Sequence, residues 1–262
     1  VLGPLLPSVA EEVGLGEVPV IAPACHDTGS AVAAVPVREK DYTYISSGTW
    51  SLMGIEVNEP IITEQSLIYN FTNEGGVVGT FRFLKNIMGL WLVQACRRAW
   101  ARAGQDFSYD ELTDMAAQAP PFGPVVDPDN NAFLRPDDMP QAIQAVCQRA
   151  GQQVPKDKGA IIRCALESLA LKYRWVQEKL ETIVGHELKV IHIVGGGSKN
   201  KLLCQFTADA TGRPVVAGPA EATAIGNVIM QALALGHVAS LEEGREVIRR
   251  SFDVIEYEPG DK

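Results

Sequence analysis

The sequence predicts an α/β fold built on one mixed sheet with flanking helices, and three observations support this prediction. Residues 42–81 contain apolar runs separated by turn residues, which is the pattern of consecutive strands. Residues 84–102 carry apolar side chains at helical spacing and predict the strongest helix of the chain. From residue 158 onward, long stretches with helical periodicity alternate with short buried-strand patterns. The chain therefore begins with strands and continues with alternating helices and strands.

The individual elements follow from turn residues and periodicity. Residues 42–46 and 50–57 flank Ser-Ser-Gly-Thr, whose small polar residues favour a hairpin turn. Residues 67–72 and 77–81 flank Asn-Glu-Gly-Gly and are expected to form two further strands of the same sheet. The remaining elements are expected as strands over 18–22, 189–194 and 214–217, helices over 28–35, 141–151, 158–185, 198–212 (with Ser198 as its N-cap) and 220–235, and a loop over 119–140.

This order differs from a doubly wound dinucleotide-binding fold, in which strands and helices alternate from the start. A strand meander followed by alternating helices and strands matches the ribonuclease-H-like ATPase core that actin, Hsp70 and sugar kinases share. We expect that core, with its mixed sheet, in this chain.

The composition excludes several classes of protein. The chain has 262 residues and a net charge of -9, and its basic residues are scattered, so no nucleic-acid-binding surface is expected. No apolar run approaches the ~20 residues that a membrane span needs, and the first residues lack a charged secretion signal. The five cysteines include no Cys-x-x-Cys pair, which favours a reduced, cytoplasmic protein without a zinc site. Their spacing leaves open whether Cys147 and Cys164 pair.

Asp27 lies in the sequence Cys-His-Asp-Thr-Gly, between a predicted strand and a predicted helix. Its carboxylate could cap the helix by accepting hydrogen bonds from the first free amides, which is the commoner role of aspartate at such a position. It could also accept the proton of a hydroxyl group during phosphoryl transfer, and a helix N-terminus favours the charged form that this requires. One carboxylate can serve both roles, so both interpretations stay open.

Two glycine-containing turns are candidate phosphate sites. The Ser-Ser-Gly-Thr turn can present backbone amides and the Thr49 hydroxyl to phosphate oxygens, although a plain hairpin turn explains the same residues. The second turn has three glycines, residues 195–197, between a buried strand and a helix, which lets a ligand approach the backbone closely. Its spacing is not G-x-G-x-x-G, and the next strand ends without an acidic residue, so a dinucleotide-dependent oxidoreductase is disfavoured.

Asn86 and Gln94 are further candidates on the helix predicted over 84–102. On that helix they would lie roughly 80° apart around the axis and about 12 Å along it. They could contact two ends of one extended ligand, or simply lie on a partly solvated face. His26 and His192 have no second histidine at metal-ligand spacing, so no metal-ligating residue is predicted.

Taken together, four stretches resemble the FGGY family of carbohydrate kinases and, within it, the rhamnulokinase group. They are Cys-His-Asp-Thr at 25–28, Ser-Ser-Gly-Thr-Trp at 46–50, Leu-Lys-Asn-Ile-Met-Gly-Leu-Trp at 84–91 and Gly-Gly-Gly-Ser at 195–198. The family's glycerol and xylulose kinases have glutamine after the aspartate, whereas this sequence has Thr28. The resemblance spans nearly the whole chain.

The resemblance implies that the chain contributes to transfer of the γ-phosphoryl group of ATP to the C1 hydroxyl of L-rhamnulose, with Mg²⁺ offsetting the phosphate charge. It also implies a role for each candidate residue: Asp27 as the catalytic base, His26 and Asn86 at the ketose, and Thr49, Gln94, Gly196, Gly197 and Asn200 at the nucleotide.

The family's kinases also have an N-terminal sugar-binding lobe, which the resemblance implies is absent from this sequence. Residues 1–40 are then interpreted as a segment with the catalytic loop and a helix between the lobes, and residues 41–262 as the nucleotide-binding domain. The missing lobe is the expected partner, and the chain alone is expected to be incomplete as an enzyme. A kinase for another ketose such as fuculose or xylulose, an actin-like ATPase and a non-catalytic nucleotide-binding module remain alternatives.

Overall fold

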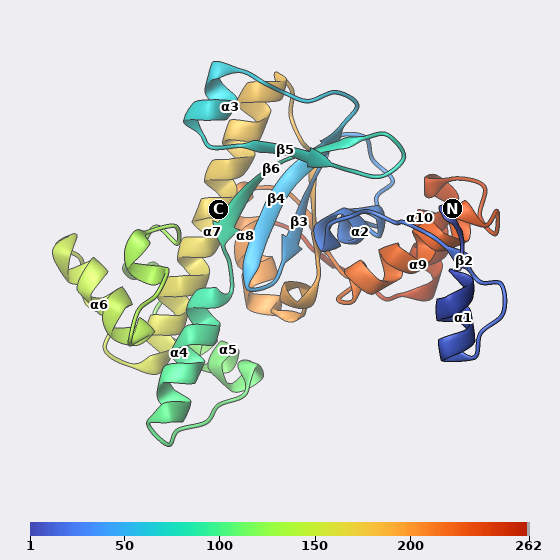
Figure 1. Cartoon of the computed structure of the whole chain (residues 1–262). Helices are drawn as coiled ribbons and strands as arrows, with labels where there is room; N and C mark the ends of the chain where they lie inside the picture. The colour runs from blue at the N-terminus through green and yellow to red at the C-terminus, as the bar shows by residue number, and fades with distance from the viewer. Residues whose placement is uncertain (261–262) are drawn as a thin grey trace.

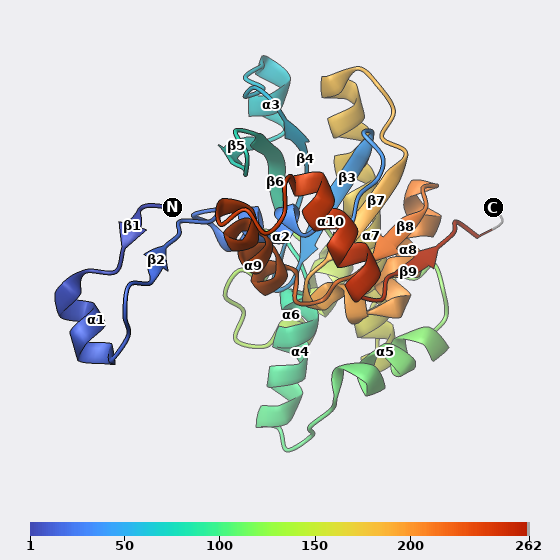
Figure 2. The same ribbon diagram turned by 90° about the vertical axis from the view of Figure 1, so that its right-hand side faces the viewer.

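Figures 1 and 2 show the computed structural model of the chain, which describes residues 1–260. Its strands are β1 (Gly3–Pro4), β2 (Pro19–Val20), β3 (Tyr42–Ser47), β4 (Trp50–Val57), β5 (Thr72–Gly75), β6 (Phe81–Met88), β7 (Val190–Val194), β8 (Val215–Ala217) and β9 (Ile255–Tyr257). Its α-helices are α1 (Pro7–Val13), α2 (Asp27–Ala33), α3 (Glu64–Ile68), α4 (Trp91–Arg102), α5 (Tyr109–Gln118), α6 (Met139–Arg149), α7 (Lys158–Val184), α8 (Lys201–Thr211), α9 (Ala222–Ala234) and α10 (Leu241–Ser251). Two short 3-10 helices are η1 (Asn131–Phe133) and η2 (Gly196–Lys199).

One mixed sheet of seven strands organises the fold, in the order β5-β6-β4-β3-β7-β8-β9. The antiparallel pairs β3–β4, β4–β6 and β6–β5 form the predicted meander. On the other side of β3, the strands β7 and β8 run parallel to it, each reached through a helix. A central first strand with a meander on one side and crossover strands on the other is the arrangement of the ribonuclease-H-like core, as the order of elements predicted.

Alternation along β3 distributes its side chains between two helical layers. Tyr44 packs in the cluster shared with α2, α9 and α10, whereas Ile45 packs in the cluster shared with α7 and α8. Thr43, on the same side as Ile45, donates a hydrogen bond from Oγ1 to Gln177 Oε1 of α7 at 2.7 Å. Figures 1 and 2 show α7 on one face of the sheet and α2 with α9 on the other. Both faces of the central strands are therefore buried.

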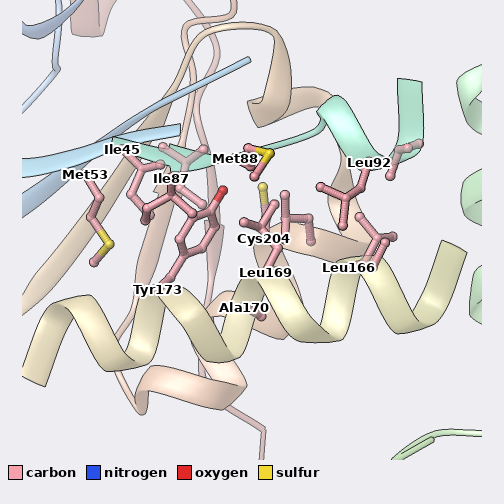
Figure 3. Packing of buried hydrophobic residues seen from close by; sticks show 14 of the residues in the cluster. Ile45, Met53, Ile87, Met88, Leu92, Leu166, Leu169, Ala170, Tyr173 and Cys204 are labelled. Carbon is pink, nitrogen blue, oxygen red and sulfur yellow. The ribbon is translucent and has the colours of Figure 1, made fainter. Parts of the chain in front are cut away.

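The larger core lies between the sheet and α7. Figure 3 shows Tyr173 of α7 reaching toward Ile45 and Ile87 of the sheet, with Leu166 and Leu169 farther along the same helix. The Tyr173 hydroxyl lies 2.6 Å from Ser51 Oγ, which gives this buried polar group a partner. Burial raises the pKa of Tyr173, so its hydroxyl stays protonated.

The predicted helix over 84–102 is wrong in its first half. Residues 81–88 form strand β6, and the helix α4 begins only at Trp91. The apolar residues Leu84, Ile87 and Met88 of β6 happen to have the spacing of one helix face, although the strand also contains Arg82 and Lys85. Gly89 marks the change of structure, since a Cβ atom there would lie 2.5 Å from Ser51 Oγ and 2.8 Å from the Trp50 carbonyl carbon.

The predicted strand over 67–72 is also wrong. Residues 64–68 form the short helix α3, whose start is fixed by a capping box between Thr63 and Ser66. Strand β5 begins at Thr72, and the turn before β6 occupies residues 76–80 instead of the predicted Asn-Glu-Gly-Gly sequence. The sheet has the expected hairpin, but its turn lies farther along the chain.

Ser198 is not the N-cap of the helix that follows the glycines. It lies within η2, and Asn200 caps α8 by accepting a hydrogen bond from Leu203 N at 2.9 Å.

Helices α5 and α10 and strand β9 were not predicted from the sequence. No helix among residues 1–260 is both long and apolar enough to cross a membrane. Cys147 and Cys164 are buried free thiols.

Candidate functional site

Three predicted motifs meet around one pocket of about 260 Å³. It lies where the parallel strands β3 and β7 end, a position where open α/β sheets commonly bind ligands. Residues that are far apart in the sequence, such as Ser46 and Gly195, come together there because the two strands are neighbours. The lining consists of Asp27, Thr28, Ser46, Ser47, Gly48, Trp50, Leu52, Gly195, Gly196, Ala220, Glu221 and Thr223.

Asp27 is the first residue of α2, but it does not cap the helix. The N-cap is His26, whose Nδ1 accepts a hydrogen bond from Thr28 N at 3.2 Å. Asp27 is exposed and lines the pocket, and no side chain among residues 1–260 pairs with its carboxylate. The positive end of the α2 dipole favours the negative charge there. The capping interpretation of Asp27 is therefore wrong, and its carboxylate is free to meet a ligand.

Helix α2 is held firmly at the site by the helices that cover it. At Gly226 of α9, an added Cβ atom would overlap the carbonyl oxygen of Ser30, so the two helices touch backbone to backbone. At the other end of α2, Arg245 of α10 donates from Nη2 to Val32 O at 3.0 Å and from Nε to Ala33 O at 3.3 Å. These contacts fix the helix whose first residue is Asp27.

Arg245 is itself held by Glu56 of β4 through an ion pair at 2.6 Å. Burial alone would lower the pKa of Arg245, but the Glu56 carboxylate raises it overall. The Tyr42 hydroxyl donates to the same carboxylate, and burial together with Glu56 raises the pKa of Tyr42 well above its usual value. This buried polar group anchors the rear of α2 to the sheet.

The turn between β3 and β4 is held by the segment that joins β6 to α4. Gly89 N and Trp91 N each donate to Thr49 O at 3.1 Å, and Leu90 N donates to Gly48 O at 3.0 Å. The side chain of Thr49 donates from Oγ1 to Gln94 Oε1 at 3.0 Å. The two sequence motifs at 46–50 and 84–91 therefore form one structural unit.

Asn86 lies on β6 and not on the helix that carries Gln94, so their predicted spacing on one helix is wrong. Asn86 is paired with Leu52 of β4, and Leu52 is paired with Ser46 of β3. Directly paired residues share a face of the sheet. Asn86 is exposed and lies on the same face as the pocket, although it is not part of the pocket's lining.

The three glycines after β7 have different surroundings. Gly195 has φ = 84° and an added Cβ atom there would lie 2.8 Å from Ser47 O. A Cβ atom at Gly197 would overlap the Ser47 hydroxyl. At Gly196 the same atom would meet nothing within 4 Å. Gly195 and Gly197 therefore let the loop lie against β3, whereas Gly196 faces the open pocket.

Asp27 and Gly196 line this pocket, whereas the other predicted site residues are not part of its lining: His26, Thr49, Asn86, Gln94, Gly197 and Asn200. Asn200 is occupied as the N-cap of α8, and its Nδ2 donates to Thr113 Oγ1 at 3.4 Å. His26 lines a neighbouring cavity of about 550 Å³ together with Glu74 and Arg82. Since His26 Nδ1 accepts from Thr28 N, its ring proton is on Nε2, which can donate to a ligand.

Glu221 and Thr223 line the pocket and were missed by the sequence analysis. They lie at the start of α9, beyond the carboxyl end of β8, and only their place after a predicted strand could have indicated them. Trp50 was part of a motif but had no assigned role, and it lines the pocket while 47% exposed.

The family assignment comes from comparison with known proteins. Residues 43–235 match the C-terminal domain of the FGGY family of carbohydrate kinases. This chain belongs to that family. It is 50% identical over 260 residues to a rhamnulokinase of Bacteroides thetaiotaomicron, covering 99% of this chain and 53% of that protein. It is 44% identical over 257 residues to a rhamnulokinase of Oceanobacillus iheyensis, covering 98% of this chain and 53% of that protein.

Solved structures of other sugar and polyol kinases share the fold. A xylulose kinase from Rhodospirillum rubrum superposes with a TM-score of 0.68 at 18% identity, over 99% of this chain and 51% of that one. A glycerol kinase of Plasmodium falciparum, solved with ADP, gives a TM-score of 0.60 at 17% identity, over 89% of this chain and 46% of that one. At these identities the likeness concerns the fold, and it confirms the predicted ribonuclease-H-like core. The FGGY chain described here spans about half the length of the curated relatives it matches.

In this FGGY chain, the pocket between the β3–β4 turn and Gly196 could accommodate a phosphate group. The side-chain-free surface at Gly196 and the hydroxyl groups of the turn suit phosphate oxygens. Residues 1–260 contain no group of three His, Cys, Asp or Glu side chains that could hold a metal ion. Mg²⁺ usually takes one or two carboxylates together with substrate phosphates, so the Asp27 and Glu221 carboxylates of the pocket suit an ion that arrives with a phosphate ligand.

Proposed function

We propose that this chain is the nucleotide-binding half of an ATP-dependent kinase that phosphorylates the C1 hydroxyl of L-rhamnulose. The observation that carries this proposal is the unpaired Asp27 carboxylate in the pocket that the β3–β4 turn and Gly196 also line. The rhamnulokinase relatives, 41–50% identical, support the choice of ketose. Residues 41–262 form the nucleotide-binding domain in this proposal, and residues 1–40 connect it to an N-terminal lobe.

In the proposed mechanism, Asp27 accepts the proton of the sugar hydroxyl as its oxygen attacks the γ-phosphorus. The oxygen–phosphorus bond to the sugar forms while the bond to the β-phosphate oxygen breaks, which releases ADP. Since α2 is fixed by Gly226 and Arg245, the backbone that carries Asp27 is held in place before the sugar arrives. Mg²⁺-ATP, when bound, supplies the phosphoryl group and neutralises part of its charge.

The other candidate residues orient the two substrates. His26 donates from Nε2 and Asn86 presents its amide from β6, and both are assigned to ketose hydroxyl groups. Thr49 is assigned to the phosphate end of the nucleotide, and Gln94 and Gly196 are assigned to contacts with the nucleotide, which can approach the Gly196 backbone closely. Gly197 and Asn200 are assigned to the adenosine side, where they support the loop that carries Gly196.

The direct test measures ADP release by a protein of full family length that contains this chain, with Mg²⁺-ATP and each of several sugars. L-rhamnulose should give the highest kcat/KM, above L-fuculose and D-xylulose, with little release when sugar is absent. Preference for another ketose would reassign the substrate within the family. Release that does not depend on sugar would indicate an actin-like ATPase, and nucleotide binding without turnover would indicate a binding module.

A further inference from the structure

The loop that contains Asp129 and Phe133 holds residues 88–91, the segment that supports the β3–β4 turn. Asp129 Oδ1 accepts a hydrogen bond from Met88 N, the last residue of β6, at 2.9 Å. Four residues later, the carbonyl oxygen of Phe133 accepts a hydrogen bond of 2.7 Å from Trp91 Nε1. Trp91 is the first residue of α4. The same loop therefore fixes both ends of the junction between β6 and α4.

Asp129 is held in turn by α7. Lys172 Nζ lies 2.9 Å from Asp129 Oδ2 and 2.9 Å from Asp127 Oδ1. Asp127 Oδ1 also accepts a hydrogen bond from Asp129 N at 3.1 Å. Because Lys172 takes one oxygen of Asp129 and the Met88 amide takes the other, the orientation of this carboxylate is fixed from both sides.

The junction between β6 and α4 holds the β3–β4 turn through hydrogen bonds. Its three amides, from Gly89, Leu90 and Trp91, donate to the carbonyls of Gly48 and Thr49. Those carbonyls belong to the β3–β4 turn, in which Gly48 lines the pocket and Thr49 is the next residue. Asp129 itself does not line the pocket. Any effect of Asp129 on a ligand must therefore pass through the junction and the turn.

We propose that Asp129, oriented by Lys172, is a positioning residue that sets the geometry of the Gly48–Thr49 turn for the phosphate chain of a nucleoside triphosphate. This inference rests on the proposed function, because it assumes that the turn binds phosphate. Met88 is buried, so loss of the Asp129 acceptor leaves its amide unpaired, and a shift of the junction would relieve the cost of that unpaired donor. Such a shift withdraws the three amides that hold the turn.

The test compares Asp129→Ala with Asp129→Asn in the kinase of full family length. The alanine variant should raise the KM for Mg²⁺-ATP, and the Kd for a non-hydrolysable ATP analogue, by about tenfold, while the KM for the ketose stays within about twofold. The asparagine variant keeps a carbonyl oxygen for the Met88 amide and should stay within about threefold of the unmodified protein.

Asp157→Ala is the matched control, since Asp157 caps α7 of the same domain by accepting from Ala160 N at 2.8 Å and touches neither the junction nor the turn. It should lower the Tm without changing the Kd for the analogue. If Asp129→Ala does not fold, Lys172→Gln replaces it, because it frees the Asp129 carboxylate while leaving an acceptor at Met88, and it should weaken binding by about threefold.

The outcomes separate this inference from the proposed function. An Asp129→Ala variant that loses Tm like Asp157→Ala but binds the analogue normally would overturn the positioning role alone. Equal weakening of ATP and ketose binding would also overturn it, since that is the result of general destabilisation. An unmodified protein that binds no ATP analogue would overturn the proposed function and this inference together.

Discussion

The Thr49 hydroxyl donates a hydrogen bond to Gln94 Oε1 at 3.0 Å across 45 residues of sequence. Thr49 belongs to the β3–β4 turn and Gln94 to the first turn of α4, and the junction between β6 and α4 brings them together. Thr49 directly follows Gly48, which lines the pocket, although neither Thr49 nor Gln94 is part of the lining. A nucleotide phosphate that takes the Thr49 hydroxyl must compete with Gln94 for it.

The first prediction concerns this hydroxyl. Thr49→Val should weaken binding of an ATP analogue by roughly 3- to 10-fold, because it removes one hydrogen-bond donor and keeps the shape of the side chain. Thr49→Ser keeps the hydroxyl and is the matched control, with binding close to that of the unmodified protein. Calorimetric titration measures both. Equal weakening in the two variants would mean that the methyl group, and not the hydroxyl, matters.

The second prediction concerns the proposed base. Asp27→Asn in the kinase of full family length should lower kcat by about 10²- to 10⁴-fold, because the amide cannot accept the hydroxyl proton. The side chain is exposed and unpaired, so the free energy of unfolding should change by no more than about 0.5 kcal/mol. Steady-state kinetics and urea unfolding test the two parts. A variant with unchanged kcat would remove Asp27 from the mechanism.

The third prediction separates two adjacent glycines. Gly197→Ala should lower the free energy of unfolding by about 1–3 kcal/mol, because its Cβ atom would overlap the Ser47 hydroxyl. Gly196→Ala has open space around its Cβ atom and should unfold almost like the unmodified protein, while weakening binding of the ATP analogue. Thermal unfolding and calorimetry on the pair decide this. Normal analogue binding by Gly196→Ala would show that the ligand does not approach this backbone.

The fourth prediction is a pH dependence of stability due to His192. Burial lowers its pKa to about 4, against a usual value of 6.5, although Glu39 opposes the shift. The folded protein thus keeps this imidazole neutral, and the stability it contributes is present above pH 6.5 and lost as the pH falls toward 4. The loss should reach roughly 2–3 kcal/mol.

Urea unfolding between pH 7 and pH 4.5 measures this dependence. His192→Phe removes the titrating group and should flatten the curve relative to the unmodified protein. His237, which is exposed, supplies the control His237→Asn, which should leave the curve unchanged. A His192→Phe curve as steep as that of the unmodified protein would assign the acid sensitivity to other groups.

The elements predicted from turns were the most accurate. The hairpin of β3 and β4 was predicted correctly because Ser-Ser-Gly-Thr admits few alternatives between two apolar runs. The error over residues 84–102 arose because Leu84, Ile87 and Met88 of β6 have the spacing of one helix face, and this spacing continues into α4. Only the contact of Gly89 with Ser51 reveals where the strand ends, and that contact is not local in sequence.

The candidate site was predictable as a set of motifs but not as a geometry. The parallel pairing of β3 with β7 brings Gly196 to the turn, as the fold class implies. His26, and not Asp27, caps α2, and sequence periodicity cannot distinguish between two adjacent residues. Glu221 and Thr223 carried no motif, because their place at the pocket depends on how α9 crosses α2. Whether these residues bind substrate stays a prediction.

The contact between Gly226 and Ser30 links the two sides of the pocket. Asp27 begins α2 and Glu221 precedes α9, and the two helices meet at a point where neither has room for an additional atom. The placement of α2 relative to α9 therefore depends on a main-chain contact. Any residue larger than glycine at position 226 should push the two helices apart, and with them Asp27 and Glu221.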